Sequence, residues 1–273
     1  MQIARSNNRL LIHDDGRYFE IEGVEDQYGF GVGSVLGQLG TLKRGAEVAA
    51  PDLLQSPFPC PTQVFAVGLN YKNHAAEMDL PLPVTPMVFA KFASCIADPN
   101  TEVQIPGDTT DWEAELVIVV GRNGRNINAA DAFSFIAGYM VGQDVSERTV
   151  QMASSPAQFS MGKSFENFAP MGPWFTTADE VDDPNDLLIQ CSLNGDLMQN
   201  ESTEDMAFFV PEIIAFISSI CELRTGDLIF TGSPAGVGQG QNPKRFLRDG
   251  DVLTTSIQKL GTITNTFRRG NQS

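Results

Sequence analysis

Two glutamates, Glu113 and Glu115, stand at the start of an apolar segment and could together bind a cation. Residues 112–120 are typical of a buried strand, in which alternate side chains share a face, so both carboxylates point the same way. They lie roughly 6.6 Å apart along the strand, close enough to reach one ion. Burial and mutual repulsion penalise such a pair, and a divalent cation removes both penalties. An exposed strand end with solvated glutamates is the alternative, and the pair alone leaves both interpretations open.

A third carboxylate, Asp144, follows the apolar residues 139–143, which are predicted to form another strand. Arg148 and Gln151 come four and seven residues later and would share one face of a following helix. Asp144 could also cap that helix, and the two roles do not exclude each other. A ligand set made only of carboxylates favours a hard ion, Mg²⁺ with Mn²⁺ or Ca²⁺ as alternatives, over zinc.

A histidine and a lysine complete the groups that could do chemistry. His74 and Glu77 are three residues apart at a predicted helix start, 73–78, where the carboxylate would orient the imidazole and raise its basicity. Such a pair suits a water-activating base, although taken alone it is also typical of a surface. Lys163 lies among small and apolar residues, so its ammonium would need a metal-bound carboxylate or an anionic substrate as partner. The alternative is a buried stem with the charged end in water.

Residues 231–238, Thr-Gly-Ser-Pro-Ala-Gly-Val-Gly, form a glycine-rich segment after a predicted strand. The segment lacks the Gly-Lys-Ser/Thr ending of a phosphate loop, so we do not expect it to bind a nucleotide. It is predicted to be a tight turn in which glycines bring the backbone close to a ligand, with a purely structural turn as the alternative. The glycines of residues 31–37 have the wrong spacing for a dinucleotide loop.

The elements that must position these groups are mostly strands. Residues 10–13 and 18–21 predict a hairpin around an Asp-Gly turn. Further strands are expected at 64–68, 87–92, 112–120, 139–143, 228–232, 252–257 and 262–267, and helices at 131–138 and 211–220. The regular strand–helix alternation of a doubly wound sheet is absent, so the fold class is α+β and strand-rich. Prolines between residues 51 and 61 indicate a boundary, with a small N-terminal β domain at 1–57 and a catalytic domain at 58–273.

Composition limits the classes of partner. The formal net charge of −16 would repel phosphate backbones and anionic lipid, so nucleic-acid and membrane binding are not expected. An anionic substrate would need local cations or a metal to reverse the field at the site. The four cysteines are widely spaced, which indicates buried thiols of a reducing compartment. Because no segment is typical of a signal peptide or a membrane span, we expect a cytoplasmic protein.

Five segments in order resemble the fumarylacetoacetate hydrolase family. They are 68–71 with His74 and Glu77, Glu113 with Glu115, Asp144 with Arg148 and Gln151, 162–165, and 231–238. The resemblance covers roughly residues 61–267 and implies a mixed β-sandwich roll and a homodimer. It departs from the family at Ser233, where threonine is usual, and at Asn167, where a small hydroxyl residue or glycine is common. Both departures are expected to affect the choice of substrate more than the chemistry.

The resemblance also implies a role for each site residue. Glu113, Glu115 and Asp144 would bind Mg²⁺ or a similar ion. His74 and Glu77 would activate water, and Lys163 would stabilise an oxyanion. The substrate contacts would come from Tyr71, Arg148, Gln151, Gly232 and Ser233.

The resulting expectation is a metal-dependent hydrolase that cleaves a carbon–carbon bond in a β-diketo acid of the acylpyruvate type. It would release a 2-oxo acid such as pyruvate, after the ion, as a Lewis acid, had stabilised an enolate. One alternative is a decarboxylase, tautomerase or dehydratase that acts on a 2-oxo acid or a sugar acid through the same enolate. Another is a metal-dependent binding protein without turnover, against which His74, Glu77 and Lys163 argue.

Overall fold

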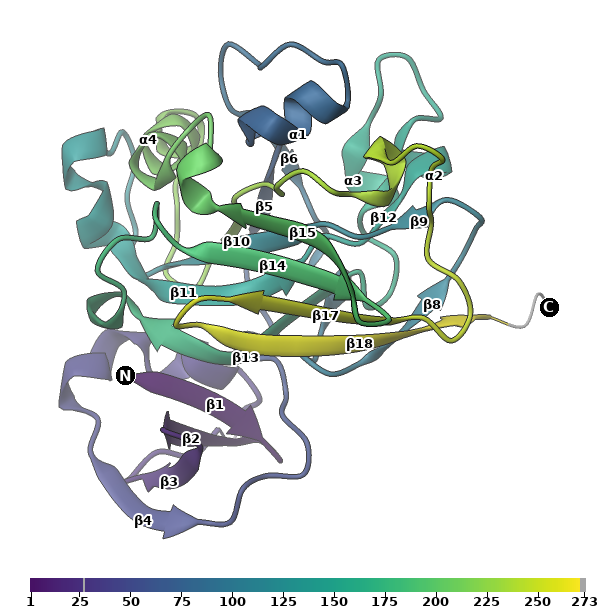
Figure 1. Cartoon of the computed structure of the whole chain (residues 1–273). Coiled ribbons are helices and arrows are strands. Elements are labelled where there is room, and N and C mark those ends of the chain that lie inside the picture. The colour runs from purple at the N-terminus through teal and green to yellow at the C-terminus, as the bar shows by residue number, and fades with distance from the viewer. Residues whose placement is uncertain (27, 271–273) are drawn as a thin grey trace.

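The computed structural model describes residues 1–26 and 28–270, which form three sheets and a few short helices (Figure 1). The strands of the largest sheet are β1 (Gln2–Ser6), β2 (Arg9–Asp14), β3 (Arg17–Ile21), β4 (Arg44–Val48), β5 (Val64–Gly68), β6 (Met87–Ala90), β7 (Ile96–Ala97), β10 (Ala114–Val120), β11 (Ile136–Gln143), β13 (Ala169–Thr177) and β16 (Leu228–Phe230). Their order is β4-β3-β2-β1-β13-β11-β10-β16-β5-β6, with β7 beside β13. The strand-rich α+β class is confirmed.

A second sheet covers the first. Its five strands are β8 (Glu102–Ile105), β14 (Leu188–Leu193), β15 (Asp196–Ser202), β17 (Val252–Ile257) and β18 (Gly261–Arg269). They run in the order β15-β14-β17-β18-β8. Figure 1 shows this sheet in front of β10 and β11, and contacts join β10 to β14 and β11 to β17. A third sheet pairs β9 (Thr110–Asp111) with β12 (Ser146–Glu147) near the candidate site.

The helices are short and lie at the edges of the sheets. The α-helices are α1 (Lys72–Glu77), α2 (Arg148–Gln151), α3 (Phe159–Gly162) and α4 (Val210–Ile220). The 3-10 helices are η1 (Gly31–Ser34), η2 (Leu36–Thr41), η3 (Ala93–Cys95), η4 (Ala129–Phe135), η5 (Ala178–Glu180), η6 (Thr203–Asp205) and η7 (Gly238–Gly240). Among the described residues, no helix combines the length and apolarity that a membrane span requires.

The N-terminal strands continue the large sheet. β1 pairs antiparallel with β13, in a register that places Gln2 opposite Thr176. The predicted hairpin is confirmed as β2–β3, and its turn has positive φ at Asp15 (48°) and Gly16 (77°), which matches the right-handed twist of the strands. The purple strands at one end of Figure 1 are this region. The division into domains at 57/58 stays a prediction, and the shared sheet makes hydrogen bonds across it.

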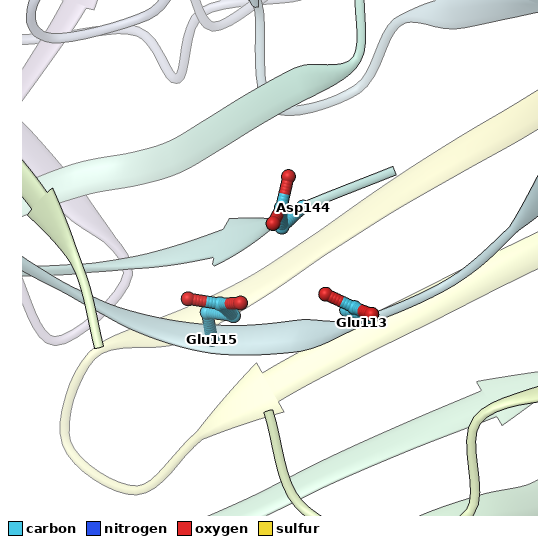
Figure 2. Close-up of side chains that lie close together, drawn as sticks. All are labelled: Glu113, Glu115 and Asp144. Atoms are coloured by element: carbon cyan, nitrogen blue, oxygen red, sulfur yellow. The ribbon is translucent and has the colours of Figure 1, made fainter. Parts of the chain in front are cut away.

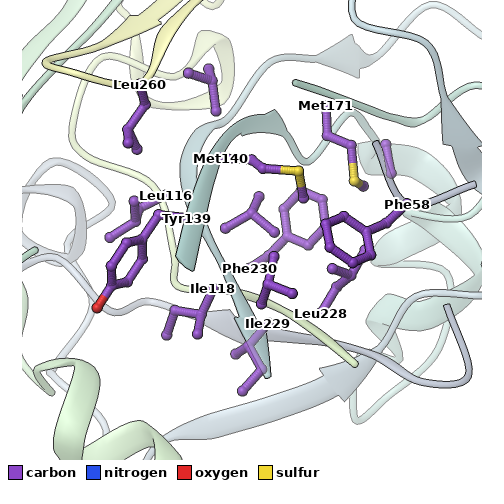
Figure 3. Close-up of a cluster of buried hydrophobic side chains, with 14 of the residues drawn as sticks. Phe58, Leu116, Ile118, Tyr139, Met140, Met171, Leu228, Ile229, Phe230 and Leu260 are labelled. Carbon is purple, nitrogen blue, oxygen red and sulfur yellow. The ribbon is translucent and has the colours of Figure 1, made fainter. Parts of the chain in front are cut away.

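The main core packs against both faces of the large sheet around β10 and β11. Every residue of β10 is buried, because β11 and β16 flank the strand and the second sheet covers it. Figure 3 shows the packing on both faces, with Leu116 and Ile118 of β10 beside Tyr139 of β11, and Met140 of β11 beside Phe230 of β16. Burial of such side chains contributes about 1.5–3 kcal/mol each. Glu115 in β10, and Glu113 directly before it, are therefore attached to a rigid strand.

Four element predictions need correction. The strands predicted at 87–92 and 228–232 end at Ala90 and Phe230. The strand predicted at 112–120 begins at Ala114, because the N–H of Glu113 donates to the Gln143 side chain at 2.9 Å instead of joining the sheet ladder. The helix predicted at 131–138 is η4, and it ends at Phe135. Residues 136–138 belong to β11, where Gly138 pairs with Thr177. Sheet pairing across the chain outweighs the local helical pattern there.

Candidate active site

Three carboxylates meet where β10 begins and β11 ends. One oxygen each from Glu113, Glu115 and Asp144 lies within 4.8 Å of the others. β10 and β11 pair antiparallel with Glu115 opposite Gly142, which brings Asp144 beside the two glutamates. Figure 2 shows the three side chains around a common space. Their residue exposures are only 6%, 1% and 0%, in chain order, so water does little to screen their repulsion.

Buried cations surround this triad. Lys163 Nζ lies 2.5 Å from Glu113 Oε2 and 2.6 Å from Asp144 Oδ2. Arg148 Nη1 lies 2.7 Å from Glu113 Oε1. Burial alone would raise the pKa of Glu113, but the charges of Lys163 and Arg148 outweigh it and hold that pKa below its usual range. Glu113 is therefore ionised and already paired.

Lys91, which the sequence pattern did not single out, is a third buried cation. Its Nζ lies 2.5 Å from Asp144 Oδ1 and also donates to the backbone carbonyl of Lys163. Lys91 thus contacts the carboxylate of Asp144 and the backbone of Lys163. The available signal was a lone lysine after the apolar residues 87–90.

Glu115 has no cationic partner among the described residues. Its Oε2 accepts one hydrogen bond, from the backbone N–H of Gly232 at 2.7 Å. Burial and then the charges of Asp144 and Glu113 raise the pKa of Glu115 well above its usual range. A divalent cation would supply the missing positive charge, and the oxygen-only donor set suits Mg²⁺ or Mn²⁺. The residues present therefore fit such an ion.

The predicted His74–Glu77 pair forms in α1. His74 Nδ1 lies 2.7 Å from Glu77 Oε1 and His74 is largely buried. Glu77 Oε2 accepts a second hydrogen bond from the Gly236 N–H at 2.9 Å. A carboxylate at Nδ1 favours the tautomer in which Nε2 is free to accept a proton. The pair therefore has the arrangement of an oriented general base.

The glycine-rich segment after β16 binds carboxylates of the site through its backbone. Besides the bonds to Glu115 and Glu77, the N–H groups of Gly238 and Gln239 donate to Asp111 at 2.7 and 3.0 Å. Asp111 in turn accepts from Arg148 Nε at 2.8 Å. Asp111 was also missed by the sequence reasoning, although it directly precedes the acidic pair.

The remaining predicted residues divide into two groups. Gln151 and Ser233 line the cavity; Gln151 Oε1 accepts from Arg148 at 3.0 Å, and Ser233 Oγ from Gln199 at 2.8 Å. Tyr71 is fully buried and is not among the described residues that line the cavity. The Gly232 N–H is occupied by Glu115. Substrate contacts by these residues stay predictions.

The site opens into a cavity of about 120 Å³. Its inner wall carries the triad together with His74, Lys163, Arg148, Gln151, Ser233 and Gln239. The rest of the lining comes from the apolar or small residues Val67, Gly68, Leu69, Met78, Leu80, Phe89, Met152 and Phe159. The cavity thus places three carboxylates, a histidine base and two cations around one space that a small molecule can enter.

Comparison with known proteins identifies the family of this chain. The sequence profile of the fumarylacetoacetate hydrolase C-terminal family matches residues 63–268. The chain belongs to the fumarylacetoacetate hydrolase family. The family resemblance and the expected fold are thereby confirmed.

Two relatives show how the activities of similar proteins differ. The chain is 42% identical over 214 residues to oxaloacetate tautomerase fahd2 of Xenopus laevis, which is 78% of this chain and 67% of that protein. It is 39% identical over 261 residues to 2,4-didehydro-3-deoxy-L-rhamnonate hydrolase of Sphingomonas sp. strain SKA58, which is 92% of this chain and 89% of that protein. Tautomerases and hydrolases thus both occur among its relatives.

Two solved structures have the same fold. Fumarylacetoacetate hydrolase from the psychrophilic Exiguobacterium antarcticum has a TM-score of 0.83 and 29% identity, covering 99% of this chain and 100% of the other. Maleylpyruvate hydrolase from Sphingobium sp. SYK-6, in complex with manganese(II) ion and pyruvate, has a TM-score of 0.77 and 26% identity over 99% and 100% of the two chains.

Proposed function

We propose that this chain is a divalent-metal-dependent hydrolase that cleaves a carbon–carbon bond in a β-diketo acid of the acylpyruvate type and releases a 2-oxo acid such as pyruvate. The observation that carries the proposal is the His74–Glu77 pair, joined at 2.7 Å, whose histidine lines the same cavity as the carboxylate triad. Hydrolysis requires a base for water, and this pair supplies one. The hydrolase relative and the maleylpyruvate hydrolase that contains manganese(II) and pyruvate support the same reaction class.

Glu113, Glu115 and Asp144 are proposed to hold the ion, Mg²⁺ or Mn²⁺. When bound, the ion would act as a Lewis acid on the oxygens of the 2-oxo acid end of the substrate. The bound ion would stabilise the charge of Glu115 most, because among the described residues Glu115 has only one hydrogen-bond partner, the backbone N–H of Gly232 at 2.7 Å. The other two carboxylates already contact lysine and arginine.

The remaining steps belong to the side chains. His74 takes a proton from water, whose oxygen adds to the distal carbonyl while Glu77 holds the imidazole. Lys163 uses two of its three N–H groups on Glu113 and Asp144, which leaves one to donate to the developing oxyanion. The carbon–carbon bond then breaks and the proton on His74 passes to the carbon that leaves. The products are a carboxylic acid and a 2-oxo acid.

Tautomerisation is the second candidate, because relatives at 41–42% identity are named oxaloacetate tautomerases. The same pair could move a proton between carbon and oxygen without adding water. In that case no bond between carbon atoms would break.

A substrate panel in heavy-oxygen water separates the two. Acylpyruvates and oxaloacetate would be incubated with the protein and Mg²⁺, and the products identified by mass spectrometry and proton NMR. We expect pyruvate plus a carboxylic acid that carries one heavy oxygen, and cleavage at least about 10²-fold slower by a His74→Ala control. Keto–enol exchange of oxaloacetate without cleavage of any acylpyruvate would overturn the hydrolase proposal.

A further inference from the structure

The cavity has two chemically different walls. The triad and its cations form the buried inner wall. A second part of the lining is apolar and comes from residues that follow α1, from β6, and from the region of α2 and α3. We call this part the apolar wall, and its members are Met78, Leu80, Phe89, Met152 and Phe159.

The apolar wall begins next to the reacting groups. The ring of Phe89 lies 5.3 Å from Lys163 Nζ. Phe159 packs edge-on against Phe89, with ring centroids 5.5 Å apart and an interplanar angle of 68°. Toward solvent the wall continues in Leu80, 45% exposed, and Met152, 61% exposed. A substrate whose distal carbonyl oxygen meets Lys163 therefore directs its acyl group along this wall.

A glycine makes room for one of the rings. A Cβ at Gly68 would lie 3.3 Å from Phe159 Cε2 and 2.5 Å from the Met87 side chain. The β5 backbone thus allows the aromatic ring to approach the cavity closely.

The apolar wall offers no cation to a second carboxylate. Among the described residues that line the cavity, the lysine and arginine are Lys163 and Arg148, and both contact buried carboxylates of the inner wall. A distal carboxylate would lose hydration without gaining a partner. The overall charge of −16 adds to that penalty.

We propose that the apolar wall makes this site selective for β-diketo acids with an uncharged hydrocarbon acyl group over those with a distal carboxylate. This inference rests on the proposed hydrolase activity and narrows its substrate class. Each methylene that reaches the wall should raise kcat/KM about fourfold, until the chain passes the exposed end of the wall. A matched substrate that ends in a carboxylate should be used at least about tenfold less well than its hydrocarbon counterpart.

The test measures kcat/KM with Mg²⁺ for acetylpyruvate, propionylpyruvate, butanoylpyruvate and succinylpyruvate, the last carrying a distal carboxylate. We expect a rise along the first three and a drop at the fourth. Phe159→Ser should flatten the rise, whereas Phe133→Ser, which changes an exposed phenylalanine outside the cavity, should keep it. Thermal melting of both variants checks that each is folded.

The outcomes distinguish the two proposals. Turnover with no dependence on chain length, or with succinylpyruvate preferred, overturns the selectivity and leaves the hydrolase standing. Absence of turnover for all four substrates overturns the hydrolase and, with it, this inference. The wild-type series gives this answer even if Phe159→Ser does not fold.

Discussion

Lys163→Met removes one positive charge from the centre of the site and keeps most of the length of the side chain. Lys163 Nζ contacts Glu113 at 2.5 Å and Asp144 at 2.6 Å. The buried charged groups of this network are the carboxylates Asp111, Glu113, Glu115 and Asp144 and the cations Lys91, Arg148 and Lys163. Carboxylates already outnumber cations by one, so the substitution widens the imbalance.

The magnitude follows from the partners that remain. Glu113 keeps Arg148 and Asp144 keeps Lys91. Removing one partner of a buried ion pair costs about 3–5 kcal/mol, and the remaining partners place the expected loss of unfolding free energy at about 3 kcal/mol without metal. A divalent ion would then enter a more negative site, so its affinity should rise on the order of tenfold or more. Because the proposed oxyanion donor is lost, kcat should fall about 10²–10³-fold with little change in KM.

Three measurements check this reasoning. Urea unfolding in EDTA and in Mg²⁺ gives the stability change, calorimetric titration gives the Mg²⁺ affinity, and initial rates give kcat and KM. Lys244→Met is the matched control, because it removes an exposed lysine. Weaker Mg²⁺ binding in Lys163→Met would contradict the expected effect of the charge on ion affinity. A rise in KM with kcat intact would instead make Lys163 a contact of the bound substrate.

Three other predictions use the same assays. Removing divalent ions should abolish turnover and Mg²⁺ or Mn²⁺ should restore it; full activity of the stripped protein would count against the triad as a metal site. His74→Ala should lower kcat about 10²–10⁴-fold while calorimetry finds an unchanged Mg²⁺ affinity, because His74 is proposed as a base and not as a ligand. Asp111→Asn should weaken the hold on Arg148, which Asp111 contacts at 2.8 Å, and should raise KM more than it lowers kcat. Equal thermal stability with unchanged kinetics would exclude this positioning role.

Much of the fold could be predicted from local pattern. The apolar run 64–68 forms a strand that is largely buried on both faces. Residues 252–257 form a strand in which alternate side chains are buried. The Asp-Gly turn predicted the β2–β3 hairpin for the same local reason. The pairing of β1 with β13 could not be predicted, because it joins residues about 170 positions apart and depends on the whole sheet. Residues 136–138 were predicted as helix for the same reason, because their strand conformation depends on pairing with the distant strands β10 and β13.

The sequence predicted which carboxylates meet at the site, but not all the residues that hold them in place. Alternation on a strand was the argument for Glu113 and Glu115, and the two carboxylates do meet, although Glu113 lies just before β10. Lys91 and Asp111 were not predicted as site residues, because each is a single charged residue beside an apolar segment. Their importance depends on partners 53 and 37 positions away along the chain, Asp144 and Arg148. Spacing in the sequence contains no such information.

The glycine-rich segment shows why a pattern typical of ligand binding can serve the protein itself. Its N–H groups donate to Glu115, Glu77 and Asp111, so they hold side chains of the site. A Cβ at Gly236 would lie 2.0 Å from the Met198 carbonyl oxygen, and one at Gly238 would lie 1.8 Å from that of Arg245. Only glycine allows the backbone to pass there and present its amides. Since one short segment holds Glu77, Asp111 and Glu115, a shift of its backbone would disturb all three together.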